Sequence, residues 1–172
     1  GQAFGLDSLR RGIARLYADL GCDVDPEEVL ITDGCMEALN LALRAVAKPG
    51  DVIAVESPTF FGFLQIIESL GMKALEIATH PRDGLSVPAL ADAIEQQNGA
   101  IRAVLLSVNI NNPFGATMPD EQKRALLKLC AEHRLPIIED EAYADLHFGS
   151  QRPAPLRAYG DTDAQVLLCS SF

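Results

Sequence analysis

The sequence predicts an α/β fold: a three-layer α/β/α sandwich in which helices cover both faces of a mostly parallel sheet. Two observations support this prediction. Segments with the 3.6-residue period of amphipathic helices alternate along the chain with short apolar runs typical of buried strands. Hydrophobic residues make up 48% of the 172 residues and charged residues 22%, which is the balance of one globular domain with a full core and not of a disordered chain.

The first helix is expected over Asp7–Leu20, with Gly21 as its C-cap. The apolar face of this helix should consist of Leu9, Ile13, Leu16 and Leu20. A short strand over residues 29–31 should follow. A second helix should then begin just after Gly34, carry Leu39, Leu43 and Val46 on one stripe, and end near Pro49.

The middle of the chain repeats the pattern of strand and helix. We expect strands over residues 52–55 and 74–77, with a helix between them whose inner face carries Phe63, Ile67 and Leu70. After a loop around Gly84, Ser86 should cap a further helix that buries Leu90 and Ile94.

The last third completes the sheet. Residues 103–108 form a continuous apolar run of the kind found in buried parallel strands. Residues 117–120 resemble a capping box, and the helix after them should have an inner face of Leu126, Leu129, Cys130 and His133. Two more strands are expected over residues 136–139 and 165–169. Strands that alternate with helices in this way favour a parallel sheet.

Charge and cysteine usage narrow the partners and the compartment. Lys and Arg number 14 against 24 Asp and Glu, a net charge of −10, so this chain is not expected to touch DNA itself. The four cysteines have neither CxxC spacing nor close histidine partners, so we expect reduced thiols, no metal site and a cytoplasmic protein. The apolar runs fall far short of the roughly 20 residues of a membrane span, and we expect neither a signal peptide nor membrane contact.

Unusual polar residues follow four of the predicted strands. They are Gly34-Cys35-Met36, Asn111 to Gly115, Asp140 to Tyr143, and Ser170-Ser171. Ligands of open parallel sheets bind beyond the carboxyl ends of the strands, so these four segments are expected to meet on one rim. There is no GxGxxG and no GxxxxGK[ST] sequence, which argues against a dinucleotide site or a Walker-type site.

Each rim segment also has a plainer interpretation. Gly34-Cys35-Met36 opens a helix, so its free N–H groups could hold a phosphate, or it could be a simple turn. Asp140 follows a buried run and needs a cationic partner there, unless it lies in a solvated acidic loop. Asn112 could serve its own backbone in a turn, and Tyr143 and Phe60 could be packing residues. Taken together on one rim, they favour a binding site.

The motifs resemble those of pyridoxal 5′-phosphate (PLP) proteins of the aspartate-aminotransferase superfamily, fold type I. The resemblance covers essentially the whole chain and rests on TDGCMEAL (32–39), ESPTF (56–60), NPFG (112–115), DEAY (140–143) and the final SF (171–172). More narrowly, GLDSLRR (5–11), DGCMEAL (33–39) and LCSSF (168–172) resemble the aminotransferase-like effector domain of MocR-type regulators in the GntR family. The resemblance implies the large PLP-binding domain of fold type I, truncated.

The resemblance also implies roles for the residues that would hold the phosphate and the face of the cofactor. The N–H groups of Gly34, Cys35 and Met36, with the Ser171 hydroxyl, would hold the phosphate. Phe60 would lie flat on the pyridine ring.

Three further residues would contact the edge of the ring. Asp140 would pair with the pyridine nitrogen and keep it protonated, which makes PLP an electron sink and supplies the cationic partner that a buried Asp140 needs. Asn112 and Tyr143 would hydrogen-bond the phenolic oxygen.

The chain departs from the family pattern in ways that bear on catalysis. The Schiff-base lysine of the family would lie two residues beyond Phe172, and the later arginines and the small C-terminal domain would also lie outside the chain. Lys48, Lys73, Lys123 and Lys128 are expected away from the rim. We therefore expect no catalytic residue within residues 1–172 and no transamination by the chain as given. Asn109-Ile110-Asn111 also differs from the approach to Asn-Pro that is common in aminotransferases, which favours a regulator.

Three functions remain open from the sequence. The first is a sensor: residues 1–172 would bind PLP and an amine or amino acid, and an N-terminal DNA-binding domain outside the chain would contact DNA. The second is a PLP-dependent aminotransferase that exchanges an amino group between an amino acid and a 2-oxo acid. The third is an α/β domain without a cofactor. Both PLP functions imply a homodimer when the protein is intact.

Overall fold

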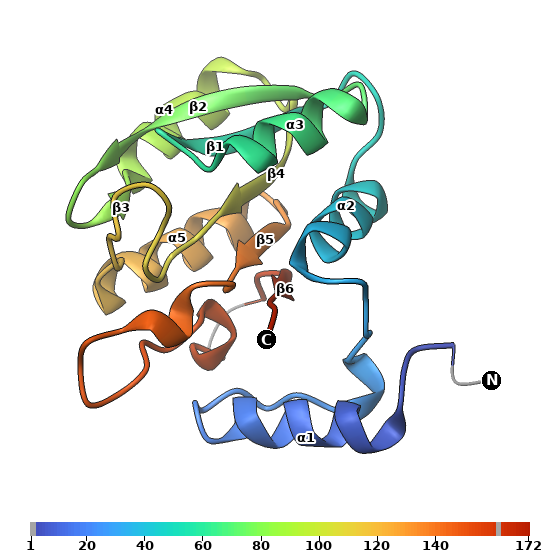
Figure 1. Ribbon diagram of the computed structural model, residues 1–172. Helices are drawn as coiled ribbons and strands as arrows, with labels where there is room; N and C mark the ends of the chain where they lie inside the picture. Colours follow the sequence, from blue (N-terminus) through green and yellow to red (C-terminus); the bar gives the residue numbers. More distant parts are fainter. Residues whose placement is uncertain (1–2, 161–162) are drawn as a thin grey trace.

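The computed structural model describes residues 3–160 and 163–172, in which a six-stranded sheet has the order β3-β2-β1-β4-β5-β6 (Figure 1). All neighbouring strands are parallel except β2 and β3, which are antiparallel. The strands are β1 (Val52–Ser57), β2 (Lys73–His80), β3 (Gly84–Leu85), β4 (Ile101–Leu106), β5 (Ile137–Asp140) and β6 (Val166–Cys169). The predicted mostly parallel sheet is confirmed.

Five α-helices and three short 3₁₀-helices lie within the described residues. The α-helices are α1 (Asp7–Ala18), α2 (Cys35–Val46), α3 (Phe61–Ser69), α4 (Val87–Gln96) and α5 (Asp120–Glu132). The 3₁₀-helices are η1 (Pro26–Glu28), η2 (Ala144–Leu146) and η3 (Leu156–Ala158). Each of the five predicted helices is present, with its ends moved by a few residues. No helix in the described parts of the chain is long and apolar enough to cross a bilayer.

The sheet and the helices on its two faces form three layers, and a hydrophobic core lies on each side of the sheet. Ile53 and Val55 of β1 point into the core under α2 and α3, whereas Ala54 between them points into the core under α4 and α5. This alternation follows from the two-residue period of a strand. The helices supply Leu39, Leu43, Phe63 and Ile67 to the first core, and Leu90, Ile94, Leu126 and Cys130 to the second.

The predicted inner face of the first helix is wrong. α1 buries Arg10, Ala14 and Tyr17, while Leu9 and Leu16 are exposed. The Arg10 Nε donates to the carbonyl of Val29 at 2.9 Å, and this contact holds the helix by its polar side. Figure 1 shows α1 apart from both helix layers, so its apolar stripe has no core to enter. Periodicity identifies an amphipathic helix but not what covers its apolar face.

Three smaller predictions are also corrected. Residues 29–31 form no strand, because their contact with the chain start is a backbone hydrogen bond from Ile31 to Phe4 rather than a ladder. The loop around Gly84 contains the two-residue strand β3, too short for any pattern to indicate. Pro119, not Thr117, is the N-cap of α5, and it makes no side-chain cap; the Thr117 hydroxyl instead accepts from the Ile110 N–H.

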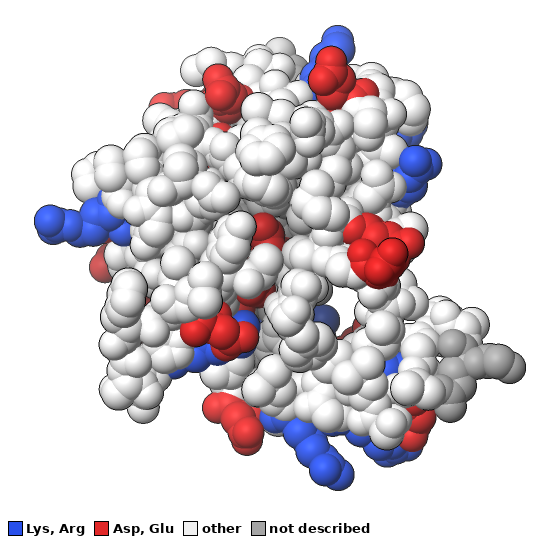
Figure 2. All heavy atoms as spheres, in the orientation of Figure 1, with Lys and Arg blue, Asp and Glu red and all other residues white. Residues whose placement is uncertain are grey.

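Charged side chains are scattered over the face drawn in Figure 2. Lys and Arg lie mainly toward its periphery and form no continuous patch on that face, which agrees with a net charge of −10. The expectation that this part of the protein does not itself bind DNA comes from its net negative charge, and the face drawn in Figure 2 has no basic patch that would bind a phosphate backbone.

Candidate functional site

The order of the strands defines the edge at which a ligand would bind. β1 lies between β2 and β4, so the strands that follow β1 along the chain are added first on one side of it and then on the other. The crevice beyond the carboxyl ends of strands at such a switch point is where α/β sheets bind ligands. β1, β4, β5 and β6 end there at Ser57, Leu106, Asp140 and Cys169.

The start of α2 has the form of an anion cradle. Gly34 is the N-cap, with φ of 84°, and no side chain caps the first turn. A Cβ added at Gly34 would meet nothing within 4 Å, so the space beside this turn is open. The unpaired N–H groups at the positive end of the helix dipole are therefore available to a phosphate.

Asp140, at the end of β5, lies in a buried environment and contacts the start of α2. Its Oδ1 accepts from the Ala142 N–H at 2.9 Å and from the Cys35 thiol at 3.3 Å. Burial raises the pKa of Asp140, while the hydrogen bonds from Ala142 and Cys35 act against that rise. Glu139 and Glu141 are also buried, so the alternative of a solvated acidic loop is wrong.

Phe60 lies beside the same helix start. Both Phe60 and Met36 border Gly62, where an added Cβ would meet the Phe60 ring, with Cζ at 2.8 Å, and the Met36 Cε at 3.0 Å. The half-buried Phe60 ring packs edge-on against Phe61 and Phe63, at centroid distances of 4.8 and 5.7 Å. The absence of a side chain at Gly62 therefore leaves room for Phe60 and Met36 beside the same glycine.

The remaining three predicted residues are less closely tied to this group. Asn112 is half-buried in the loop after β4, Tyr143 is 39% exposed, and Ser171 is exposed just after β6. The pairing of Asp140 with Cys169 in the sheet brings Ser171 to the same rim. No hydrogen bond between these three side chains and Asp140 is found among the described residues. A hydrogen bond thus joins Cys35 to Asp140, and Phe60 packs against the core cluster that contains Cys35, whereas Asn112, Tyr143 and Ser171 share only the rim.

Sequence reasoning missed the role of another buried carboxylate, Glu56, in supporting the rim. Glu56, at the end of β1, accepts from the Ser107 N–H at 3.0 Å and from the Asn111 side-chain amide at 2.8 Å. Asn111 in turn accepts from the Ala116 N–H, which closes the loop that carries Asn112. Burial raises the pKa of Glu56 to about 7. The signal was present, since an acidic residue ended an apolar strand, but nothing in the sequence named its partners.

A buried ionic network lies behind the rim on the α5 side. Glu141 accepts from Asn109 at 2.8 Å and pairs with Arg152 at 3.0 Å. The Lys123 amino group donates to Asn109 at 2.8 Å and to the Ala154 carbonyl at 2.7 Å. Lys123 therefore comes nearer to the strand ends than its position on a helix suggested, but its amino group is committed to this network.

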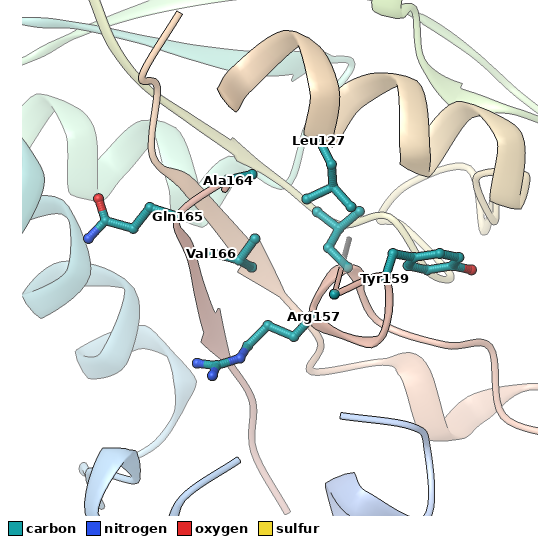
Figure 3. Close-up of a pocket in the computed structure, with 8 residues that line it drawn as sticks. Leu127, Arg157, Tyr159, Ala164, Gln165 and Val166 are labelled. Carbon is teal, nitrogen blue, oxygen red and sulfur yellow. The ribbon is translucent and has the colours of Figure 1, made fainter. Parts of the chain in front are cut away.

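The cavity drawn in Figure 3 lies at the amino end of β6, opposite the rim formed by the carboxyl ends of the strands. It has a volume of about 290 Å³ and is lined by Leu127, Tyr159 and Val166, among others. Val166 is the first residue of β6, so this cavity lies at the amino end of that strand, away from Asp140. Arg157 extends away from Leu127 and pairs with Glu28 at 3.0 Å. The polar groups converge at the rim and not at this cavity, so the rim is the candidate site.

Comparison with known proteins identifies the family. The family model described as aminotransferase class I and II matches residues 1–172. The chain belongs to this aminotransferase family. Proteins of the family use PLP as their cofactor. The fold agrees, since an archaeal alanine:glyoxylate aminotransferase superposes with a TM-score of 0.91 at 29% identity, over 99% of this chain and 42% of that chain.

Curated relatives within the aminotransferase family include transcription regulators. The chain is 46% identical over 164 residues to the uncharacterized HTH-type transcriptional regulator YjiR of Escherichia coli K12, covering 95% of this chain and 34% of that protein. It is 42% identical over 168 residues to the HTH-type regulator YdcR of the same organism, covering 98% of this chain and 35% of that protein. The chain thus spans about a third of the length of these relatives.

Proposed function

We propose that this chain is the PLP-binding domain of a GntR/MocR-type transcriptional regulator, in which it senses an amine or an amino acid. The observation that carries the proposal is the contact between Cys35 and Asp140, which joins a helix-start phosphate cradle to a buried carboxylate on one rim. The similarity to HTH-type regulators, at 46% and 42% identity, supports a regulator over an enzyme.

The chemistry of the residues at the rim fits PLP. The cofactor would supply an electron-withdrawing pyridinium ring when bound. The first N–H groups of α2, with Ser171, would bind its phosphate. Asp140 would hold the hydrogen on the ring nitrogen, which is chemically reasonable because its pKa is raised and its charge needs a cationic partner. Phe60 would cover one face of the ring and exclude water from it, and Asn112 and Tyr143 would orient the phenolic oxygen.

The rest of the regulator is proposed from the relatives. Residues 1–172 would be the large domain, and DNA contact would come from an N-terminal domain outside this chain, in a cytoplasmic protein. We further propose a homodimer. The exposed apolar side chains of Phe4, Leu6, Leu9 and Leu16 support this, because an amphipathic helix in water needs a partner for its apolar face.

A second candidate function is a PLP-dependent aminotransferase acting on an amino acid and a 2-oxo acid. The match in fold to an alanine:glyoxylate aminotransferase favours it. Sequencing the native polypeptide upstream of Gly1 discriminates the two. A basic extension of roughly 100 residues with a helix-turn-helix pattern supports the regulator. A start within a few tens of residues leaves the aminotransferase as the better proposal.

Cofactor binding is tested on the chain itself with pyridoxamine 5′-phosphate, the amine form of PLP. This form cannot make an imine with a protein lysine, so its affinity reports the non-covalent contacts of the proposed rim alone. Saturable one-to-one binding, followed by the fluorescence of the pyridine ring, is expected. Absence of binding at millimolar concentration would argue for an α/β domain without a cofactor.

A further inference from the structure

Two hydrogen bonds hold Oδ1 of Asp140. The Ala142 N–H and the Cys35 thiol both donate to Oδ1, at 2.9 and 3.3 Å. A carboxylate has lone pairs on both oxygens, so with two donors on Oδ1 the lone pairs of Oδ2 still have room for a further donor. Cys35 is the first residue of α2 and Asp140 the last residue of β5, 105 positions further along the chain. This contact therefore fixes the carboxylate relative to the proposed phosphate cradle.

The Cys35 thiol is a donor that can orient the Asp140 carboxylate without strongly lowering its pKa. Burial, and then the charge of Asp140, raise the pKa of the Cys35 thiol, so it keeps its hydrogen and can donate. A thiol is a weak hydrogen-bond donor compared with a hydroxyl. A weak donor stabilises the charged carboxylate less, which leaves Asp140 more basic than a serine at position 35 would.

Several other groups surround Asp140 and must be separated from this effect. The side chain of Ser107, after β4, also hydrogen-bonds Asp140. Titratable groups that sense its charge include Glu56 at the end of β1, Glu141 beside it and Cys169 of β6. Each of these differs from Cys35 in one respect: none is shown donating to Oδ1.

We propose that Cys35 is a positioning residue for Asp140, whose thiol holds Oδ1 so that Oδ2 is presented to the ring nitrogen of the cofactor. This inference rests on the proposed function for its ligand, but the contact itself can be tested without one. Cys35 would thus serve the site twice, through its backbone N–H at the phosphate and through its side chain at the carboxylate. Substitution of the side chain leaves the first contribution in place.

The test compares Cys35→Ala and Cys35→Ser with the unsubstituted chain. The pKa of Asp140 is followed by ¹³C NMR of labelled aspartate carboxyls, with Asp140→Asn assigning the signal. Relative to the unsubstituted chain, we expect a pKa higher by about half a pH unit in Cys35→Ala and lower by a similar amount in Cys35→Ser. Cys130→Ala, at a buried thiol in the other core, is the matched control and should leave the pKa unchanged.

Binding of pyridoxamine 5′-phosphate gives the second readout. Cys35→Ala should raise its dissociation constant about fivefold, the value of one hydrogen bond, and Cys35→Ser should restore it to within about twofold. Equal Asp140 pKa values in all three chains would overturn the inference, as would an unchanged dissociation constant in Cys35→Ala. If the unsubstituted chain binds no pyridoxamine 5′-phosphate, the proposed function fails, and the order of the three pKa values still decides whether Cys35 controls Asp140.

Discussion

At the scale of single residues, opposing effects set the behaviour of Asp140. Burial raises its pKa and its hydrogen bonds lower it. A cation placed against the carboxylate would remove the cost of burying its charge. Asp140 is therefore the residue at which the free chain and the cofactor-bound chain should differ most.

Replacement of the Asp140 carboxylate by an amide should weaken cofactor binding and leave the fold intact. We expect Asp140→Asn to raise the dissociation constant for pyridoxamine 5′-phosphate at least tenfold, because a hydrogen bond to a charged group contributes about 1.5–3 kcal/mol. Asp92→Asn, at an exposed position of α4, is the control and should bind normally. Fluorescence titration measures both. Unaltered affinity in Asp140→Asn would remove Asp140 from the site.

Glu56 predicts a dependence of stability on pH. Its pKa is raised on folding from 4.5 to about 7, so the folded chain binds this proton more tightly than the unfolded chain. The free energy of unfolding should therefore fall as the pH rises from 4.5 to 7, by about 3 kcal/mol from this group. Urea unfolding at pH 5 and pH 8 measures the fall, which should be smaller in Glu56→Gln by about that amount. An equal fall in both chains would contradict the assignment.

The residues of the rim differed in how far the sequence could predict them. Asp140, Gly34 and Asn112 could be named because each follows a strand or opens a helix, and strand ends of a parallel sheet share one edge. The links from Glu56 to Ser107 and Asn111 could not, because they join residues 51 and 55 positions apart. A contact over such a separation depends on the register of the sheet, which no local pattern contains.

At the scale of elements, the sequence predicted which helices and buried strands are present, but it predicted the residues at which they begin and end less accurately. Leu90, Leu126 and Cys130 are buried as their periodicity predicted, whereas His133, predicted on the same inner face as Leu126, is exposed just past the end of α5. Lys123 is also buried on α5, where its aliphatic stem packs and its amino group finds oxygen acceptors. A pattern of apolar letters cannot indicate such a residue. The apolar stripe of α1 is the opposite case: its leucines were predicted to be buried and are exposed, because α1 packs in neither helix layer of the sandwich.

Two helix glycines offer a matched pair of substitutions. Gly12 of α1 has open space around it, so Gly12→Ala should stabilise the chain by up to about 1 kcal/mol through helix propensity. Gly62→Ala should gain nothing, because the new methyl group would displace the Phe60 ring. Urea unfolding measures the first effect. Binding of pyridoxamine 5′-phosphate should weaken in Gly62→Ala and stay unchanged in Gly12→Ala; equal affinity in both would show that Phe60 does not cover the cofactor.

At the scale of the whole molecule, the layered architecture was the easiest feature to predict. Alternation of helix-period and strand-like segments leaves few arrangements that bury both faces of a parallel sheet. The antiparallel strand β3 escaped prediction because two residues have no detectable period. The apolar surface left on α1 was not foreseen, since the sequence does not show which stripe meets the core.

The proposed homodimer gives a prediction at this scale. Sedimentation of the chain should show self-association that the double substitution Leu9→Glu and Leu16→Glu removes, because both side chains are exposed on the apolar stripe. Leu64→Glu, at an exposed leucine of α3, is the control and should leave association intact. Dissociation by the control alone would move the interface from α1 to α3.

All four cysteines are free and buried, so the reactivity of each thiol reports how often the structure around it opens. A buried thiol reacts with an alkylating reagent only when its surroundings open, so each labelling rate measures a local opening equilibrium. Cys35 and Cys169 lie in the core behind the rim, while Cys130 lies in the core on the far face of the sheet. Mass spectrometry of a timed alkylation would therefore rank the two halves of the sandwich by how often they loosen, without any added probe.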